Sequence, residues 1–290
     1  MIPLRPFDIH QPATTREASE MLAHYGDEAG FYAGGTELLL AMKHGALNYR
    51  HLIDLKGVSG VNSIEVRNDS LEIGTVTTHR AIERSALVRQ KQPALAELES
   101  QVANVRVRAT GTLGGNLCFA EPHSDPATLL LVLGATLRLE GSEDAREITL
   151  DKFIAGAYAN NLRPNEILAK IIVPSAKPSE RAAYMKFQVH ERPTLGLALW
   201  LETPDGGYTF TAGRVAVGCA CPFPTRVLGA EGLLAGSREQ VQRRLPETAD
   251  AIGAAADLVD DNEGSVEYKQ HLIHVFLRRL FRKVLGESTA

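Results

Sequence analysis

Two pairs of adjacent glycines place the strongest local constraint on how this chain can fold. Gly34 and Gly35 lie between a hydrophobic, strand-like approach and the helix-like run "TELLLAMKHG". Gly114 and Gly115 follow Gly111 in a segment that has the composition of a surface turn. Glycine has no β-carbon, so such turns let the backbone approach a bulky group closely. Each pair therefore predicts either a ligand-binding turn or a plain tight turn.

The order of residues around the first pair favours an anionic ligand. A helix that starts just after Gly35 would present the N–H groups of Gly35, Thr36 and Glu37 at its positive end, where phosphate binds well. The alternative is a tight turn with Thr36 as the N-cap. Two such segments in one chain suit an extended diphosphate, such as that of a dinucleotide. Neither has the G-x-G-x-x-G spacing of a Rossmann site, and no G-K-[ST] follows a glycine run, so both of those nucleotide sites are disfavoured.

The succession of patterns predicts an α+β chain with two domains. Residues 1–58 alternate short strands and helices and predict a small α/β unit, and residues 59–176 open with a β-hairpin and predict a larger mixed β-sheet unit. The segment 175–181, "SAKPSER", is rich in proline, serine and charge and is typical of a linker. Residues 177–290 then predict a C-terminal α+β domain, in which helices follow a short antiparallel sheet.

Composition excludes several functional classes. A net charge of −4 gives no support for a nucleic-acid partner, and the longest apolar run, residues 127–137, is too short to cross a bilayer. The three cysteines, Cys118, Cys219 and Cys221, favour neither a disulfide scaffold nor a metal centre, and "RVAVGCACPF" predicts a strand with Cys219 and Cys221 on one buried face. The N-terminus lacks the pattern of a signal peptide, so a cytoplasmic location is expected.

The last helical pattern, "VEYKQHLIHVFLRRLFRKVLG", is both apolar and basic. Leu272, Phe276, Leu280 and Val284 recur at helical spacing and predict a face that docks on a core. Its arginines would also suit a lipid or RNA surface. Cations are stabilising near a helix C-terminus, and we favour the core-docked helix because the rest of the chain is acidic.

Five segments together resemble the FAD-binding medium subunit of the molybdenum hydroxylases. They are "AGGTELLLAMK", "LIDLKGV", "IGTVTTH", "TGTLGGNLCFAEPHSDPATLLLVLGA" and "YMKFQVHERPT", and the resemblance extends over essentially the whole chain. That family includes the flavoprotein subunits of carbon monoxide dehydrogenase and the FAD domain of xanthine dehydrogenase. The resemblance implies that residues 1–176 form an FAD-binding domain and that residues 177–290 form the C-terminal flavoprotein domain.

The resemblance also implies which residues contact FAD. These residues fall in the two glycine segments and at four later positions. They are Ala33, Gly34, Gly35, Thr36, Glu37, Thr112, Leu113, Gly114, Gly115, Asn116, Asp125, Leu168, Tyr184 and Lys186. Asp125 has an alternative role as a helix N-cap, shared with Ser124, and Tyr184 has one as an ordinary strand residue. His79 and Arg108 match family positions that support the site. No catalytic acid or base and no metal ligand is expected.

By the same resemblance, the chain transfers electrons. Iron–sulfur clusters of a partner subunit would deliver electrons to FAD, which passes them to an external acceptor. The molybdenum cofactor and two [2Fe–2S] clusters would lie in a large and a small partner subunit, in a dimer of heterotrimers. The first segment reads "AGGTE" where the carbon monoxide enzymes read "AGGHS", so that substrate is not favoured. The alternatives are a stand-alone FAD oxidase or reductase of the same fold and a non-enzymatic accessory protein.

Overall fold

The structure is a computed structural model that describes residues 4–189 and 191–287. These residues form two compact units. Unit 1 contains the described residues up to Ala120 together with Thr136–Val173, and unit 2 contains Glu121–Ala135 together with the described residues from Pro174 onward. Both units combine helices with β-sheets, which confirms the predicted α+β fold class. No helix in the described ranges is long and apolar enough to span a bilayer.

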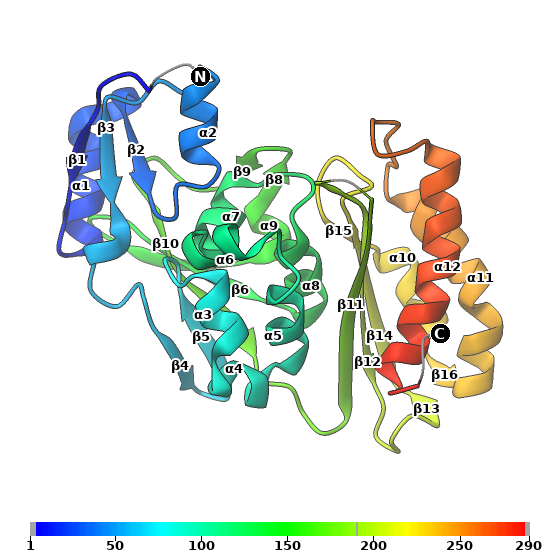
Figure 1. The fold of residues 1–290 in the computed structure, drawn as a ribbon. Helices are drawn as coiled ribbons and strands as arrows, with labels where there is room; N and C mark the ends of the chain where they lie inside the picture. Colours follow the sequence, from blue (N-terminus) through cyan, green and yellow to red (C-terminus); the bar gives the residue numbers. More distant parts are fainter. Residues whose placement is uncertain (1–3, 190, 288–290) are drawn as a thin grey trace. The chain divides into compact units, whose positions relative to one another are not determined.

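The first sheet of unit 1 is a parallel sheet with strand order β1–β3–β2 (Figure 1). Its elements are β1 (Asp8–His10), α1 (Thr15–Tyr25), η1 (Gly26–Glu28), β2 (Ala29–Tyr32), α2 (Leu38–Lys43), β3 (His51–Asp54) and η2 (Leu55–Gly57). Thr14 caps α1 by accepting a hydrogen bond from the N–H of Glu17. Ala18 on α1 then packs in the same apolar cluster as Ile53 on β3. The predicted small α/β unit is confirmed.

The second sheet of unit 1 has five strands, in the order β4–β5–β10–β6–β7. These strands are β4 (Ile64–Arg67), β5 (Ser70–Gly74), β6 (Thr136–Glu140), β7 (Ala145–Thr149) and β10 (Ile167–Pro174). Asn68 and Asp69, with φ of 48° and 57°, form the turn between β4 and β5. A two-residue hairpin turn of this kind requires positive φ, which Asn and Asp tolerate. The predicted hairpin is therefore confirmed.

Short helices make up most of the rest of unit 1. They are α3 (His79–Arg84), α4 (Ala86–Lys91), α5 (Pro93–Glu99), α6 (Val105–Thr110), α7 (Leu113–Phe119) and α9 (Leu150–Phe153), and a small ribbon of β8 (Ile154–Gly156) and β9 (Ala159–Asn160) follows them. Helices α3 and α4 are separated only by Ser85. Ser85 has extended backbone angles and its side chain accepts a hydrogen bond from the N–H of Val88, so it ends α3 and caps α4.

Unit 2 is built on an antiparallel sheet with strand order β11–β12–β14–β15. The strands are β11 (Glu180–Gln188), β12 (Pro193–Glu202), β14 (Ala212–Gly218) and β15 (Thr225–Arg226). The other elements are α8 (Asp125–Leu133), β13 (Thr209–Phe210), α10 (Leu228–Glu231), η3 (Gly232–Leu234), β16 (Gly236–Ser237), α11 (Arg238–Ala255) and α12 (Val266–Val284). A short antiparallel sheet followed by helices is the predicted arrangement.

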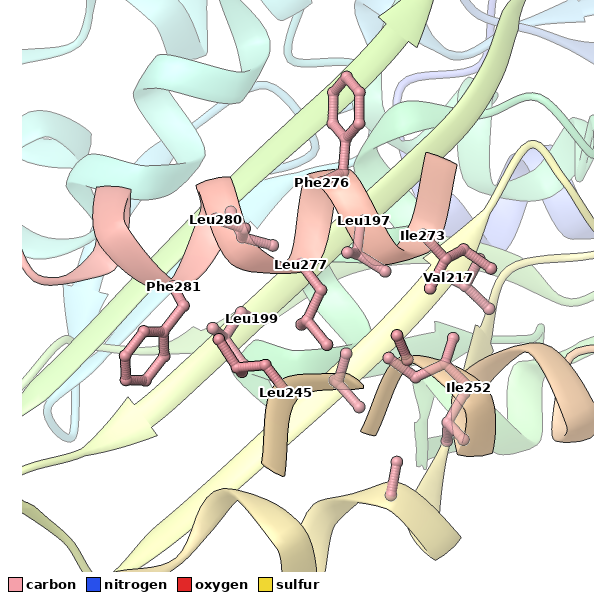
Figure 2. Packing of buried hydrophobic residues seen from close by; sticks show 14 of the residues in the cluster. Leu197, Leu199, Val217, Leu245, Ile252, Ile273, Phe276, Leu277, Leu280 and Phe281 are labelled. Carbon is pink, nitrogen blue, oxygen red and sulfur yellow. The ribbon is translucent and has the colours of Figure 1, made fainter. Parts of the chain in front are cut away.

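Strand β12 is covered on both faces. Alternate leucines of β12, such as Leu197 and Leu199, join a core with α11 and α12 (Figure 2). On the same core lie Phe276 and Leu280 of α12, as the helical spacing predicted. Helix α8 also contacts β12 and β14, and it approaches β14 so closely that a β-carbon on Gly218 would lie 2.1 Å from Oγ1 of Thr128.

Two segments differ from the sequence prediction. Residues 121–135, which we expected in the first domain, group with unit 2, because the apolar helix α8 packs on β12 and β14. Cys219 and Cys221 do not share a strand, because β14 ends at Gly218 and Cys219 has a φ of 64°. Both thiols are nevertheless buried, as expected, and burial raises the pKa of Cys221 to about 12.

Candidate functional site

The two glycine segments of unit 1 lie in direct contact. A β-carbon on Gly34 would lie 2.4 Å from the carbonyl oxygen of Thr110 and 2.7 Å from Cα of Gly111. A β-carbon on Gly115 would lie 3.8 Å from Cβ of Ala33. Only glycine at position 34 permits this approach, because the opposing atoms belong to the backbone and cannot rotate away. The two segments therefore converge, as their sequences suggested.

The first segment leaves backbone donors available. Gly35 has a φ of 72°, a conformation that favours glycine. Among the described residues, no acceptor is found for the backbone N–H groups of Gly34, Gly35 and Thr36. Helix α2 begins only at Leu38, so Thr36 is not its N-cap, and the cap position falls on Glu37. Three successive amides are thus placed where they could donate to an anionic group.

A lysine that the sequence analysis did not single out lies at this turn. Nζ of Lys56 is 3.3 Å from the carbonyl oxygen of Ala33, 3.0 Å from Oδ1 of Asp54 and 3.8 Å from the ring centroid of Tyr32. The strand order could have pointed to Lys56, because β2 and β3 are parallel neighbours whose carboxyl ends meet at one edge of the sheet. Lys56 follows the end of β3, and Gly34 follows the end of β2.

The second glycine segment is organised differently. Gly114 and Gly115 lie within the first turn of α7, and Thr112 caps this helix by accepting a hydrogen bond from the N–H of Gly115 at 3.1 Å. The structure thus corrects the predicted surface turn to a helix. The two adjacent glycines were misleading, because glycine has a low helix propensity and a pair of glycines therefore predicts a turn.

The amides in the first turn of α7 are already paired within the protein. The N–H groups of Leu113 and Gly114 donate to the carbonyl oxygens of Thr77 and Thr75 at 3.1 and 3.0 Å, and the N–H of Asn116 donates to that of Thr112. A β-carbon on Gly114 would lie 1.7 Å from Oγ1 of Thr75. Gly114 therefore lets α7 pack on the chain that leaves β5.

Three further predicted residues lie on elements of unit 1 outside the glycine segments' own turns. The backbone N–H of His79 donates to the carbonyl oxygen of Gly111 at 3.1 Å. Arg108 is paired with Glu83 at 3.3 Å and also donates to the carbonyl oxygen of Val102 at 3.0 Å, which ties α6 to α3. Leu168 lies on β10 and is 2% exposed. His79 is thus bonded to the second segment, and Arg108 holds the helix before it; their role as supports of a flavin site, which the resemblance implies, stays a prediction.

A second candidate cluster lies entirely within unit 2. Asp125 is the first residue of α8, and Ser124 holds the N-cap position, so the alternative role of Asp125 as the cap is not found. Oδ1 of Asp125 accepts a hydrogen bond from the Tyr184 hydroxyl at 2.5 Å, and Oδ2 accepts one from Nζ of Lys186 at 2.7 Å. Burial, and then the charge of Asp125, raises the pKa of the Tyr184 phenol well above its ordinary value.

The two clusters suit different kinds of ligand group. In unit 1, three amides and the Lys56 ammonium suit an anionic group such as a diphosphate. In unit 2, the Asp125 carboxylate is held by two donors and still has lone pairs for a ligand hydroxyl. Within the described ranges, no group of three or more His, Cys, Asp or Glu side chains could hold a metal ion.

Comparison with known proteins gives matches along nearly the whole chain. The family model of the FAD binding domain in molybdopterin dehydrogenase matches residues 5–176, and that of the CO dehydrogenase flavoprotein C-terminal domain matches residues 182–284. The carbon monoxide dehydrogenase medium chain of Hydrogenophaga pseudoflava is 30% identical over 96% of this chain and 96% of its own. The xanthine dehydrogenase FAD-binding subunit of Escherichia coli O157:H7 is 27% identical over 97% of this chain and 95% of its own.

Solved structures agree with these matches. A chain from the crystal structure of the Cu,Mo-CO dehydrogenase in its cyanide-inactivated form superposes with a TM-score of 0.92 at 27% identity, covering 99% of this chain and 100% of its own. A chain of the carbon monoxide dehydrogenase from Hydrogenophaga pseudoflava that lacks the Mo-pyranopterin moiety gives a TM-score of 0.91 at 28% identity, covering 98% of this chain and 99% of its own.

Proposed function

The chain belongs to the family of FAD-binding medium subunits of the molybdenum hydroxylases, and we propose that it passes electrons from iron–sulfur clusters of a partner subunit through FAD to an external acceptor. The observation that carries the proposal is the first glycine turn. Three successive amides without a protein acceptor in the described chain, and one lysine, lie where Gly34 meets the second glycine segment. This donor set suits the diphosphate of a flavin dinucleotide.

Within this proposal, the protein binds and orients FAD, and FAD supplies the redox chemistry when it is bound. Gly34, Gly35 and Thr36 would donate their N–H groups to the diphosphate, and Lys56 would neutralise part of its charge. No step requires a side chain to abstract a proton from a substrate.

The remaining family-matched positions are proposed as further contacts. In unit 1 these are Glu37, Thr112, Leu113, Asn116 and Leu168, together with Ala33, Gly114 and Gly115. The first-turn amides of α7 are already paired, so we propose that this segment contributes shape. In unit 2, Asp125 with Lys186 and Tyr184 is proposed as a separate contact set, because its carboxylate can still accept hydrogen bonds.

The proposed partners follow from the family. Relatives are named as the medium chain or the FAD-binding subunit of larger enzymes, which implies a large and a small partner. We propose that the molybdenum cofactor lies in the large subunit, that two [2Fe–2S] clusters lie in the small one, and that the assembly is a dimer of heterotrimers in the cytoplasm. The residues of this chain favour no particular substrate or electron acceptor, although the "AGGTE" segment argues against carbon monoxide.

The flavin site is tested by comparing two glycines with the same backbone strain. Gly35 and Gly45 have φ of 72° and 76°, so the backbone strain of alanine is similar at both, but only Gly35 lies at the proposed site, where the added β-carbon would also lie 2.4 Å from Cε2 of Tyr32. We expect Gly35→Ala to lose FAD on purification and Gly45→Ala to keep it, as measured by the flavin absorption spectrum per chain. If both variants retained FAD equally, the first turn would be removed from the site.

The partner assignment is tested by isolating the chain with whatever accompanies it. FAD together with a larger and a smaller subunit, identified by mass, would support the electron-transfer subunit. FAD on the isolated chain, with turnover of a small molecule in the absence of partners, would instead indicate a stand-alone oxidase or reductase. A protein purified without flavin that also fails to bind added FAD would contradict the proposal and indicate an accessory protein.

A further inference from the structure

A buried carboxylate lies behind the second glycine segment. Glu99 ends α5 and is 0% exposed, and its Oε2 lies 2.6 Å from Nδ1 of His79, which is itself 2% exposed. The other oxygen, Oε1, has no hydrogen-bond partner among the residues that the structure describes. Because a buried carboxylate is stable only when it is paired, His79 fixes Glu99 and Glu99 in turn fixes the His79 ring.

His79 connects this pair to the junction of the glycine segments. Its backbone N–H donates to the carbonyl oxygen of Gly111 at 3.1 Å, and its Cδ2 lies 3.3 Å from the position of a β-carbon on Gly111. Cα of Gly111 is in turn 2.7 Å from the position of a β-carbon on Gly34. Hydrogen bonds therefore join Glu99 to His79 and His79 to Gly111, and Gly111 lies beside Gly34 of the first glycine turn, all within unit 1.

Local stability does not explain why a carboxyl group and an imidazole are buried here. Helix α3 is already capped by Thr78, whose side chain accepts a hydrogen bond from the N–H of Ala81 at 3.2 Å, and Thr78 also pairs with Thr112. Replacing a buried polar pair by apolar residues of similar volume is often neutral or stabilising. A short hydrogen bond of defined geometry, in contrast, fixes the orientation of an imidazole more narrowly than apolar packing does.

We propose that Glu99 and His79 form a positioning pair that holds Gly111 against Gly34 in the arrangement that binds the flavin diphosphate. The inference rests on the proposed function for its ligand, but the positioning itself is a property of the FAD-free protein. Neither side chain needs to touch FAD. The pair acts by keeping the amides of the first turn in register with the second segment.

The test uses variants that keep or remove the hydrogen bond between the two side chains. Glu99→Gln keeps an oxygen acceptor facing Nδ1, and His79→Asn keeps an N–H donor near the place of Nδ1, whereas Glu99→Ala and His79→Ala remove the contact. The two alanine variants should raise the FAD dissociation constant by about tenfold or more, and the two conservative variants should stay within about threefold of the unmodified protein. The assay is a flavin fluorescence titration of the FAD-free protein.

Amide hydrogen exchange of the FAD-free protein supplies a second readout. The alanine variants should exchange faster at residues 33–37 and 110–116 while the β4–β5 hairpin is unchanged. A matched control is His274→Ala, which breaks another imidazole–carboxylate pair, 2.8 Å from Asp250, in unit 2 and should alter neither readout. If Glu99→Ala bound FAD as tightly as the unmodified protein, the inference would be overturned.

Two further outcomes separate the inference from its premise. If Glu99→Gln were as impaired as Glu99→Ala and exchange rose throughout unit 1, the pair would serve only general stability, which would overturn the positioning role. If the unmodified protein bound no FAD, the proposed function would fail. The exchange experiment would then still decide the positioning of Gly111, because a local change at 110–116 supports it and an unchanged rate overturns it.

Discussion

Replacing Gly34 by alanine should separate the two glycine segments. The added β-carbon would lie 2.4 Å from the carbonyl oxygen of Thr110, and ordinary contact begins near 3.4 Å. The segments must therefore move apart by about 1 Å, because the opposing atoms are backbone. Overpacking of this kind costs about 1–3 kcal/mol. If all of it appeared in ligand binding, FAD affinity would fall by about 5-fold to 150-fold.

The measurement is a flavin titration of the Gly34→Ala protein, accompanied by thermal unfolding without FAD. Gly57→Ala is the matched control in the same unit, because a β-carbon there would meet nothing nearer than 3.8 Å. We expect the control to match the unmodified protein in both assays. Unchanged FAD affinity in Gly34→Ala, with the variant folded, would refute the reasoning that this contact shapes the site.

Two further predictions concern charge in unit 1. Lys56→Gln removes the ammonium beside Ala33 and should weaken FAD binding by about tenfold at low salt. The loss should be smaller at high salt, because salt screens the attraction between Lys56 and the diphosphate in the unmodified protein. An equal effect at both salt concentrations would contradict a charge contribution. Arg146 donates to both oxygens of Glu166 at 2.7 and 2.8 Å and lowers the pKa of that carboxyl from 4.5. Its stabilisation is therefore present above about pH 4.5 and is lost as the pH falls through the depressed pKa of the folded state. Glu166→Gln should flatten the dependence of the unfolding free energy on pH below 4.5, and an unchanged slope in urea unfolding would contradict this.

Local sequence signals were sufficient for elements that are stabilised locally. The Asn68–Asp69 turn is encoded by two residues that tolerate positive φ, and the apolar spacing of α12 matches the face that packs on β12. The two glycine pairs were also recognised, and their convergence followed from the need for close backbone approach.

Features that depend on tertiary packing were missed. Helix α7 contains two glycines in its first turn, which propensity disfavours, and it forms because Thr112 caps it and Thr75 accepts its amide. Glu99 could not be recognised from the sequence as a partner of His79, because the two residues lie on different helices and nothing in the nineteen residues between them marks the contact. Lys56 could have been found from the parallel strand order alone.

The placement of α8 has a consequence for how the polypeptide can be divided. The chain passes from unit 1 to unit 2 after Ala120, returns after Ala135 and leaves again after Val173, so neither unit is a continuous stretch. A cleavage near residue 176 would leave the C-terminal fragment without the helix that covers one face of β12 and β14. Exchanging the C-terminal half between related proteins at a single crossover near residue 176 would likewise pair the β11–β12–β14–β15 sheet of one protein with the α8 helix of the other.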